Sequence, residues 1–240
     1  MWELYDELLS EISENQTVTK VIEGPVWTAV ETDSGNVGIA MTTARECVDR
    51  CVGSYEGLSL HKAAELVKSW NLREASVGMA AINAFLNTPE RLELFDLRQK
   101  QDGHSTFGMD VTGRNVVMIG ALRSKTELES RGAHVTVLER EEKPGTLPDS
   151  AAEFVIPGCD ILVITASALI NKTLPRLLEL GRTSTIVLTG PSAPMSKKLL
   201  SFGISRVTGM TVTDTAAMMR HVADGTQGQP YSMGERFCIE

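Results

Sequence analysis

Two short polar segments carry the residue types best suited to hold a small molecule. The first is T-A-S-A-L-I-N-K-T, residues 165–173, which follows an apolar run. Its candidate ligand-binding residues are Thr165, Ser167, Asn171 and Thr173. Hydroxyl and amide groups beside a helix start can hold an anion or a polar ring. A structural role is also open, because Thr173 stands where a helix N-cap is expected, with Pro175 in the first turn.

The second segment is T-G-P-S-A-P, residues 189–194. Gly190 permits close approach or a positive φ, whereas Pro191 and Pro194 remove two backbone donors. Ser192 adds a hydroxyl group. We expect Gly190, Pro191 and Ser192 to contribute to the same site. The alternative is a stiff strand-to-helix turn in which Ser192 caps the helix.

A strand–helix–strand pattern at residues 116–141 supplies two further candidates. The turn G-A-L-R-S-K has the single glycine Gly120 where a dinucleotide loop has three, which disfavours NAD and FAD. Glu139 stands at the end of the second strand, where an acid can accept hydrogen bonds from ribose hydroxyls. A nucleoside-type ligand such as S-adenosylmethionine suits this pattern better. The alternative for Glu139 is a solvated charge cluster, E-R-E-E-K.

The segment N-L-R-E-A-S-V-G-M-A-A-I-N-A-F-L, residues 71–86, predicts a helix rich in small residues. Ser76 and Asn83 are seven apart and share a face, so they are candidates to face a cleft between two domains. The alternative is ordinary tight packing. Glu74 is a candidate acid or base, but with Asn71 it matches a capping-box pattern, and we favour capping.

Cys47 and Cys51 are the only candidates for a direct metal site. On a helix they would share a face, and two thiolates are half of a tetrahedral zinc site. No paired Cys or His follows at a zinc-finger spacing, so buried, unreactive cysteines are the favoured interpretation.

These residues must be positioned by two different arrangements of elements. Residues 1–98 predict an α+β domain with a helix at 2–14, strand-like runs at 20–32 and 36–42, and two later helices. Between the two runs, D-S-G-N suits a hairpin turn. Residues 99–114 are polar and aperiodic, which indicates a linker.

From residue 115 onward strands and helices alternate. Strands are expected at 115–120, 134–139, 160–165, 185–189 and 204–207, with helices at 122–130, 151–155, 174–180, 195–202 and 215–223. The tail Y-S-M-G-E-R-F-C-I is a candidate edge strand. The pattern predicts a Rossmann-like, doubly wound parallel sheet over 115–240, in which ligands bind beyond the carboxyl ends of the strands.

Charge and hydropathy restrict the classes of binding partner to expect. The 240 residues carry a formal charge of −8 without a Lys/Arg stripe, so nucleic acid is not an expected partner. No apolar run approaches the roughly 18 residues of a membrane span, and the acidic N-terminus lacks the features of a secretory signal. We expect a cytoplasmic protein without a membrane partner. A homo-oligomer is compatible with the sequence.

Three motifs together carry a resemblance to a known family. E-A-S-V-G-M-A-A-I-N-A at 74–84, C-D-I-L-V-I-T-A-S-A-L-I-N-K-T-L at 159–174 and L-T-G-P-S-A-P at 188–194 resemble the putative heavy-metal chelation family. The resemblance implies an enolase-N-terminal-like domain followed by a Rossmann-like domain similar to that of methyltransferases. It also implies a site between the two domains.

The leading expectation is a protein that binds a metal-chelating or heterocyclic molecule, of pterin, flavin or siderophore type, in that cleft. The alternative is an enzyme of condensation, hydrolysis or methyl transfer acting on such a molecule. A third hypothesis is a divalent heavy metal bound directly by the two cysteines named above.

Overall fold

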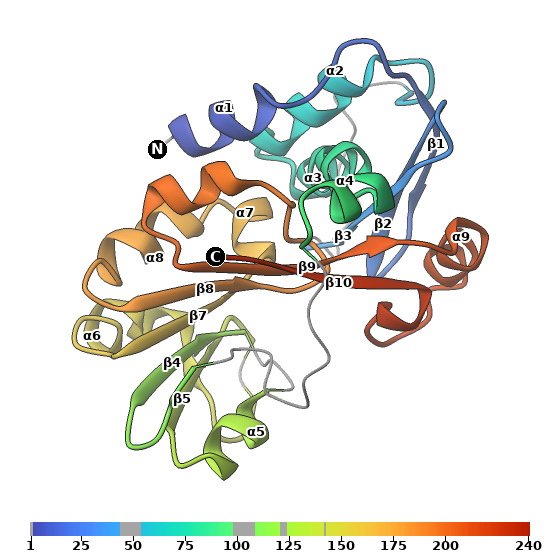
Figure 1. Ribbon diagram of the computed structural model, residues 1–240. Coiled ribbons are helices and arrows are strands. Elements are labelled where there is room, and N and C mark those ends of the chain that lie inside the picture. Colours follow the sequence, from blue (N-terminus) through green and yellow to red (C-terminus); the bar gives the residue numbers. More distant parts are fainter. Residues whose placement is uncertain (1, 44–53, 98–108, 121–123, 142) are drawn as a thin grey trace.

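The computed structural model describes residues 2–43, 54–97, 109–120, 124–141 and 143–240 (Figure 1). It contains a three-stranded antiparallel sheet and a seven-stranded, mostly parallel sheet. The mixed α/β class expected from the sequence is confirmed. We call residues 2–97 the first unit and residues 109–240 the second unit.

The first unit holds the small sheet and its helices. In chain order the elements are α1 (Glu3–Leu9), β1 (Val18–Glu23), β2 (Trp27–Thr32), β3 (Val37–Met41), α2 (Leu60–Glu65), the 3-10 turn η1 (Leu66–Lys68), α3 (Leu72–Leu86) and α4 (Pro89–Leu94). The predicted hairpin turn between β2 and β3 is present, and Gly35 adopts a φ of 81° there. The strand expected over 20–32 is instead two antiparallel strands, broken at Gly24 and Pro25.

Helix α3 shows why its sequence is so rich in small residues. Asn71 is the N-cap, as expected, and its side chain accepts a hydrogen bond from the Arg73 N–H at 3.1 Å. A Cβ at Gly78 would lie 2.0 Å from the backbone nitrogen of Val67, and one at Gly38 would lie 2.0 Å from that of Ala84. The backbones of α3, β3 and η1 therefore pack in direct contact.

The second unit holds the large sheet. Its strands are β4 (Asn115–Ile119), β5 (His134–Glu139), β6 (Leu147–Pro148), β7 (Ile161–Thr165), β8 (Thr185–Thr189), β9 (Arg206–Val212) and β10 (Gly234–Ile239). Their order is β10-β9-β8-β7-β4-β5-β6, and every neighbouring pair is parallel except β10 with β9. The order of the strands reverses between β4 and β7, the place where open α/β sheets bind ligands.

Short helices connect these strands. They are α5 (Lys125–Ser130), η2 (Asp149–Ala151), α6 (Ala152–Val155), α7 (Ser167–Ile170), α8 (Leu174–Leu180), η3 (Lys197–Phe202), α9 (Thr215–Ala223) and η4 (Tyr231–Met233). The tail forms β10 at the sheet edge, as expected. Three details differ from expectation. The polar segment 165–173 contains a short helix, α7, and β6 is an additional short strand. The helix expected at 195–202 is a 3-10 helix that begins at Lys197.

The two units share their cores. The largest apolar cluster joins Tyr5 and Ala81 of the first unit to Leu169 and Phe237 of the second. A second cluster packs Trp27 of β2 against Met218 of α9, so the small sheet lies between α3 and α9 (Figure 1). This explains why β2 is buried along almost its whole length.

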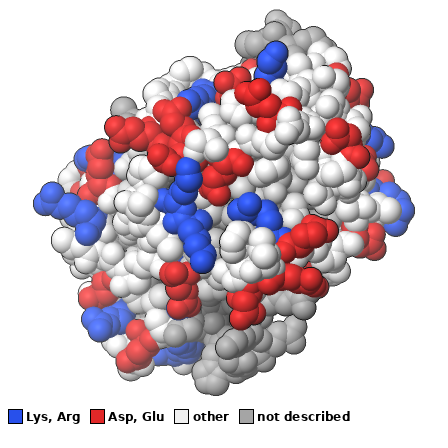
Figure 2. Space-filling model, turned by 45° about the horizontal axis from the view of Figure 1, so that its top comes forward, with Lys and Arg blue, Asp and Glu red and all other residues white. Residues whose placement is uncertain are grey.

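The helices and one face of the surface can be described by their hydropathy and charge. Within the described residues, no helix has the length and apolarity needed to cross a bilayer. On the face shown in Figure 2, basic side chains occur in small groups between acidic ones. This agrees with an excess of 31 acidic over 23 basic residues.

Candidate functional site

A cleft of about 1520 Å³ opens at the carboxyl ends of the central parallel strands. All nine residues predicted from the second unit as ligand contacts line it: Gly120, Glu139, Thr165, Ser167, Asn171, Thr173, Gly190, Pro191 and Ser192. The opposite wall comes from the first unit and includes Trp27, Met41, Thr42 and Arg73. The structure therefore brings the four predicted strand ends together beside the small sheet.

A row of threonines crosses the sheet at the ends of β7 and β8 and at the neighbouring position within β9. Thr165 is paired with Thr189, and Thr189 with Thr208, in register across the sheet. The Thr208 hydroxyl donates to Thr189 Oγ1 at 2.8 Å, and Thr165 Oγ1 lies 3.1 Å from Ser167 Oγ. Because in-register neighbours in a parallel sheet point to the same face, these hydroxyls form one polar surface.

Two glycines shape the turns beside this surface. Gly120 has a φ of 93° and Gly190 a φ of 122°, conformations that L side chains rarely adopt. A Cβ at Gly120 would also lie 3.1 Å from Thr165 Cγ2. Glycine at both positions therefore keeps side chains out of the turns that follow β4 and β8.

Asn171 organises the loop that follows β7. Its Oδ1 accepts hydrogen bonds from the Thr173 N–H at 3.1 Å and from the Thr173 hydroxyl at 2.6 Å. Thr173 is the N-cap residue of α8, as expected, but its hydroxyl makes no capping bond to the helix. Since Oδ1 is occupied, the amide nitrogen of Asn171 is the group left for a ligand, and it makes no hydrogen bond within the described residues.

Lys172 is a cleft residue that the sequence reading missed. It has a positive φ of 64°, which is uncommon for a residue other than glycine. Its Nζ donates to the Ile170 carbonyl at 2.8 Å and to the Ser69 carbonyl of the first unit. Burial lowers the pKa of Lys172 to about 8. The letters N-K-T show a lysine in the loop, but they do not show its backbone conformation or its contact with the other unit.

Other cations of the cleft are engaged with protein groups. Arg73 Nε lies 3.5 Å from Glu23 Oε1, and Lys143 Nζ lies 2.9 Å from Glu139 Oε1. Arg176 pairs with Glu153 at 2.6 Å. The Arg236 guanidinium stacks on the Tyr231 ring, 4.0 Å from its centroid. The cleft thus presents both signs of charge, with several of the pairs already formed.

Asn83 does not lie where the sequence reading expected it. It is 1% exposed and does not line the cleft. Its Nδ2 donates to the Ile39 carbonyl at 2.8 Å and to the Ser192 carbonyl at 3.1 Å. Ser192 Oγ in turn accepts from the Met41 N–H at 2.9 Å rather than capping a helix. Asn83 therefore positions the 189–194 segment from behind, because its amide is used by backbone groups.

Ser76 and Glu74 are also buried behind the cleft wall. Ser76 donates to the Leu72 carbonyl at 2.9 Å, in its own helix, and does not line the cleft. Glu74 is 1% exposed and accepts a hydrogen bond from the Ser69 hydroxyl at 2.8 Å. The expected face of α3 is therefore packed, and Glu74 supports the residues before the helix.

A second carboxamide, Asn87, was not singled out from the sequence. Its Nδ2 donates to the carbonyls of Ala193 at 2.8 Å and Met210 at 3.1 Å, and its Oδ1 accepts from the Met195 N–H at 2.6 Å. Asn87 stands one turn after Asn83, so the end of α3 holds the 189–196 segment at successive backbone groups.

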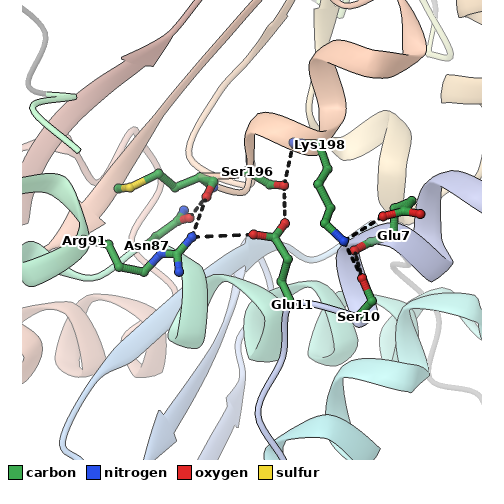
Figure 3. Close-up of polar contacts among 8 residues, drawn as sticks. Glu7, Ser10, Glu11, Asn87, Arg91, Ser196 and Lys198 are labelled. Atoms are coloured by element: carbon green, nitrogen blue, oxygen red, sulfur yellow. Dashed lines mark hydrogen bonds and ion pairs between the residues drawn. The ribbon is translucent and has the colours of Figure 1, made fainter. Parts of the chain in front are cut away.

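Figure 3 shows how α1 and the residues just after it complete this support. Glu11 lies between the Ser196 hydroxyl, which donates to it, and the Arg91 guanidinium, whose Nη2 is 3.6 Å from Oε2. Lys198 reaches back to Glu7 at 2.7 Å and to Ser10 Oγ at 2.6 Å. The segment that borders the cleft is thus attached to the first unit on its far side.

The described residues contain no group of three or more His, Cys, Asp or Glu side chains arranged to hold a metal ion. The carboxylates of the cleft are instead paired with cations, as for Glu139 with Lys143. Cys47 and Cys51 lie outside the described residues, so the structure does not bear on their predicted role.

Comparisons with known proteins agree with this architecture. The chain is 24% identical to a solved protein of unknown function from Pyrococcus horikoshii, with a TM-score of 0.81 and coverage of 99% of this chain and 98% of the other. That likeness supports the fold. The chain is also 23% identical to an uncharacterised protein of Methanocaldococcus jannaschii, over 88% of this chain and 86% of the relative.

A stronger match is a crystal structure of a protein of unknown function from Desulfitobacterium hafniense. It is 32% identical, has a TM-score of 0.89, and covers 100% of this chain and 97% of the other. Two family models, both described as "Putative heavy-metal chelation", match residues 5–86 and 106–239. The chain therefore belongs to the putative heavy-metal chelation family.

Proposed function

We propose that the protein binds a small metal-chelating or heterocyclic molecule, of pterin, flavin or siderophore type, in the cleft between the two units. One observation carries the proposal: nine polar or conformationally special residues from four separate strand ends line a single cleft. Such convergence at the switch in strand order is the usual place for a ligand in an open α/β sheet.

The size and lining of the cleft favour an organic ligand over a bare ion. Its volume of about 1520 Å³ exceeds the usual range of roughly 300–1,000 Å³ for small-molecule pockets. Apolar side chains such as Met41 and Leu177 lie beside hydroxyls and cations. Because the described residues supply no metal cluster, heavy-metal chelation would use donor atoms of the bound molecule.

The test is ligand-induced stabilisation of the folded protein. Pterins, flavins and catechol siderophore fragments, each with and without a divalent metal, should be screened for a rise in Tm. A ligand at about 100 times its Kd stabilises the folded state by roughly 2.7 kcal/mol, which corresponds to a rise in Tm of about 5–11 °C for a chain of this length.

Two variants separate site binding from general effects. Thr165→Val with Ser167→Ala removes two cleft hydroxyls with little change in shape and should reduce the shift. Thr19→Val removes an exposed hydroxyl of β1 that does not line the cleft and should keep it. An equal shift in both variants would place the ligand elsewhere.

A second candidate function, methyl transfer with S-adenosylmethionine, rests on Glu139. This carboxylate ends β5, lines the cleft beside Gly120, and is where a ribose hydroxyl would be accepted. Calorimetric binding of S-adenosylmethionine to wild type, weakened at least tenfold by Glu139→Gln, would favour this enzyme. Absence of any nucleoside binding would remove the methyl-transfer version and leave condensation or hydrolysis to be tested on the bound molecule.

A further inference from the structure

Lys172 is a cleft cation without a carboxylate partner among the described residues. An ammonium group has three N–H donors. Two donate to the carbonyls of Ile170 and Ser69. Within the described residues no carboxylate pairs with Lys172, whereas Arg73, Lys143 and Arg176 each have one. The third N–H therefore has no protein acceptor among the described residues, on a side chain that lines the cleft.

The neighbouring residue leaves a second donor unused. The atom of Asn171 that accepts from the Thr173 N–H must be the carboxamide oxygen, because a backbone N–H only donates. The amide nitrogen of Asn171 is thereby assigned, and it has no partner within the described residues. Adjacent positions of one loop thus offer an ammonium N–H and an amide N–H to the same cleft.

We propose that Lys172 and Asn171 hold a carboxylate or equivalent oxyanion of the bound molecule, with Lys172 as the anchor. This inference rests on the proposed function and narrows the ligand class to molecules with an anionic arm. A charge-assisted hydrogen bond to a half-buried ammonium is about twice as strong as a neutral one. The lowered pKa of Lys172 agrees with a cation that lacks an anionic partner.

The test compares each acid with its uncharged amide. Three pairs suit the proposed ligand types: pyridine-2,6-dicarboxylate and its diamide, pterin-6-carboxylate and its amide, and 2,3-dihydroxybenzoate and its amide. Binding is measured by calorimetry at pH 7 to the full chain. At least one acid should bind wild type tenfold or more tightly than its amide. In Lys172→Met that ratio should fall to near one.

Matched variants separate anchoring from a structural role. Lys172→Arg keeps the charge and should restore part of the preference for the acid. Lys125→Met removes one positive charge from α5, away from the cleft lining, and should leave the ratio unchanged. Loss of the bonds to Ser69 and Ile170 would weaken acid and amide together, so it would not move the ratio.

The outcomes distinguish the two proposals. Preference for the acid that survives in Lys172→Met overturns the anchor but leaves the proposed function standing. Equal affinity of wild type for each acid and its amide would also overturn the anchor and leave the proposed function standing. If no member of any pair binds wild type, the proposed function fails and the anchor fails with it.

Discussion

At the scale of single residues, most of the polar side chains of the cleft could be predicted from the sequence, but Lys172 could not. Glycine at 120 and 190 and hydroxyls at 165 and 167 could be predicted from the sequence, because they directly follow apolar strands and ligands bind beyond the carboxyl ends of such strands. Lys172 could not, because its value depends on a positive φ and on the Ser69 carbonyl, which is distant in sequence.

The titration of Lys172 predicts a pH effect on stability. Its pKa is about 8 in the folded protein, against an ordinary value of 10.5. Between these values the unfolded chain binds more protons, so through this group the free energy of unfolding rises with pH. The Tm of wild type minus that of Lys172→Met should therefore increase between pH 8 and pH 10. A constant difference over that range would contradict the assignment.

Gly120 predicts a conformational effect. Gly120→Ala places a side chain at a φ of 93° and 3.1 Å from Thr165 Cγ2. Gly35→Ala has a similar φ of 81° but would meet nothing within 4 Å. Urea unfolding should show both variants destabilised, with Gly120→Ala the worse by about 1 kcal/mol, since it adds crowding to strain. Equal losses would mean that Thr165 moves aside freely.

At the scale of elements, α3 and the 189–196 segment are built as a pair. Pro191 and Pro194 remove two backbone donors from that segment. Two of its carbonyls accept hydrogen bonds from the carboxamides of Asn83 and Asn87. The sequence predicted α3 and its cap correctly, because both follow from local pattern. It assigned Asn83 to the ligand, because periodicity shows which residues share a face but not what covers that face.

Replacement of the buried Asn87 should destabilise the protein more than replacement of an exposed asparagine. Asn87→Ala leaves the Ala193 and Met210 carbonyls and the Met195 N–H without their side-chain partner in a buried place. The free energy of unfolding should fall by at least about 2 kcal/mol. Asn15→Ala, at an exposed loop position, should change it by less than about 0.5 kcal/mol. Urea titrations of the two variants measure the contrast, and similar midpoints would refute it.

At the scale of the whole molecule, the two units are separate in sequence but not in packing. The small sheet is covered on one face by α3 and on the other by α9, which comes from the far end of the chain. The sequence pattern divides the chain into two sets of elements, but it does not show that the apolar surfaces of the two sets pack together. The buried Tyr5 hydroxyl, which donates to the Leu169 carbonyl at 2.8 Å, is one such contact.

The shared core predicts that neither unit is stable alone. The full chain should unfold in one cooperative transition. Residues 109–240 expressed alone would lack the apolar groups of the first unit that pack in one cluster with Leu169 and Phe237. The apolar surface left exposed should make this fragment bind a hydrophobic dye and give a broad transition. Calorimetry and dye fluorescence test this, and a sharp transition in the isolated fragment would show that the packing between units is dispensable.

The attachment of the 189–196 segment to α3 and to Glu11 has a consequence for how such proteins can diversify. The backbone that borders the cleft in the second unit is held by Asn83, Asn87 and Glu11 of the first. A chimera that exchanged the first unit between two relatives would also exchange the supports of that border. Substitutions that shift this border of the cleft therefore need matching changes in both halves of the chain.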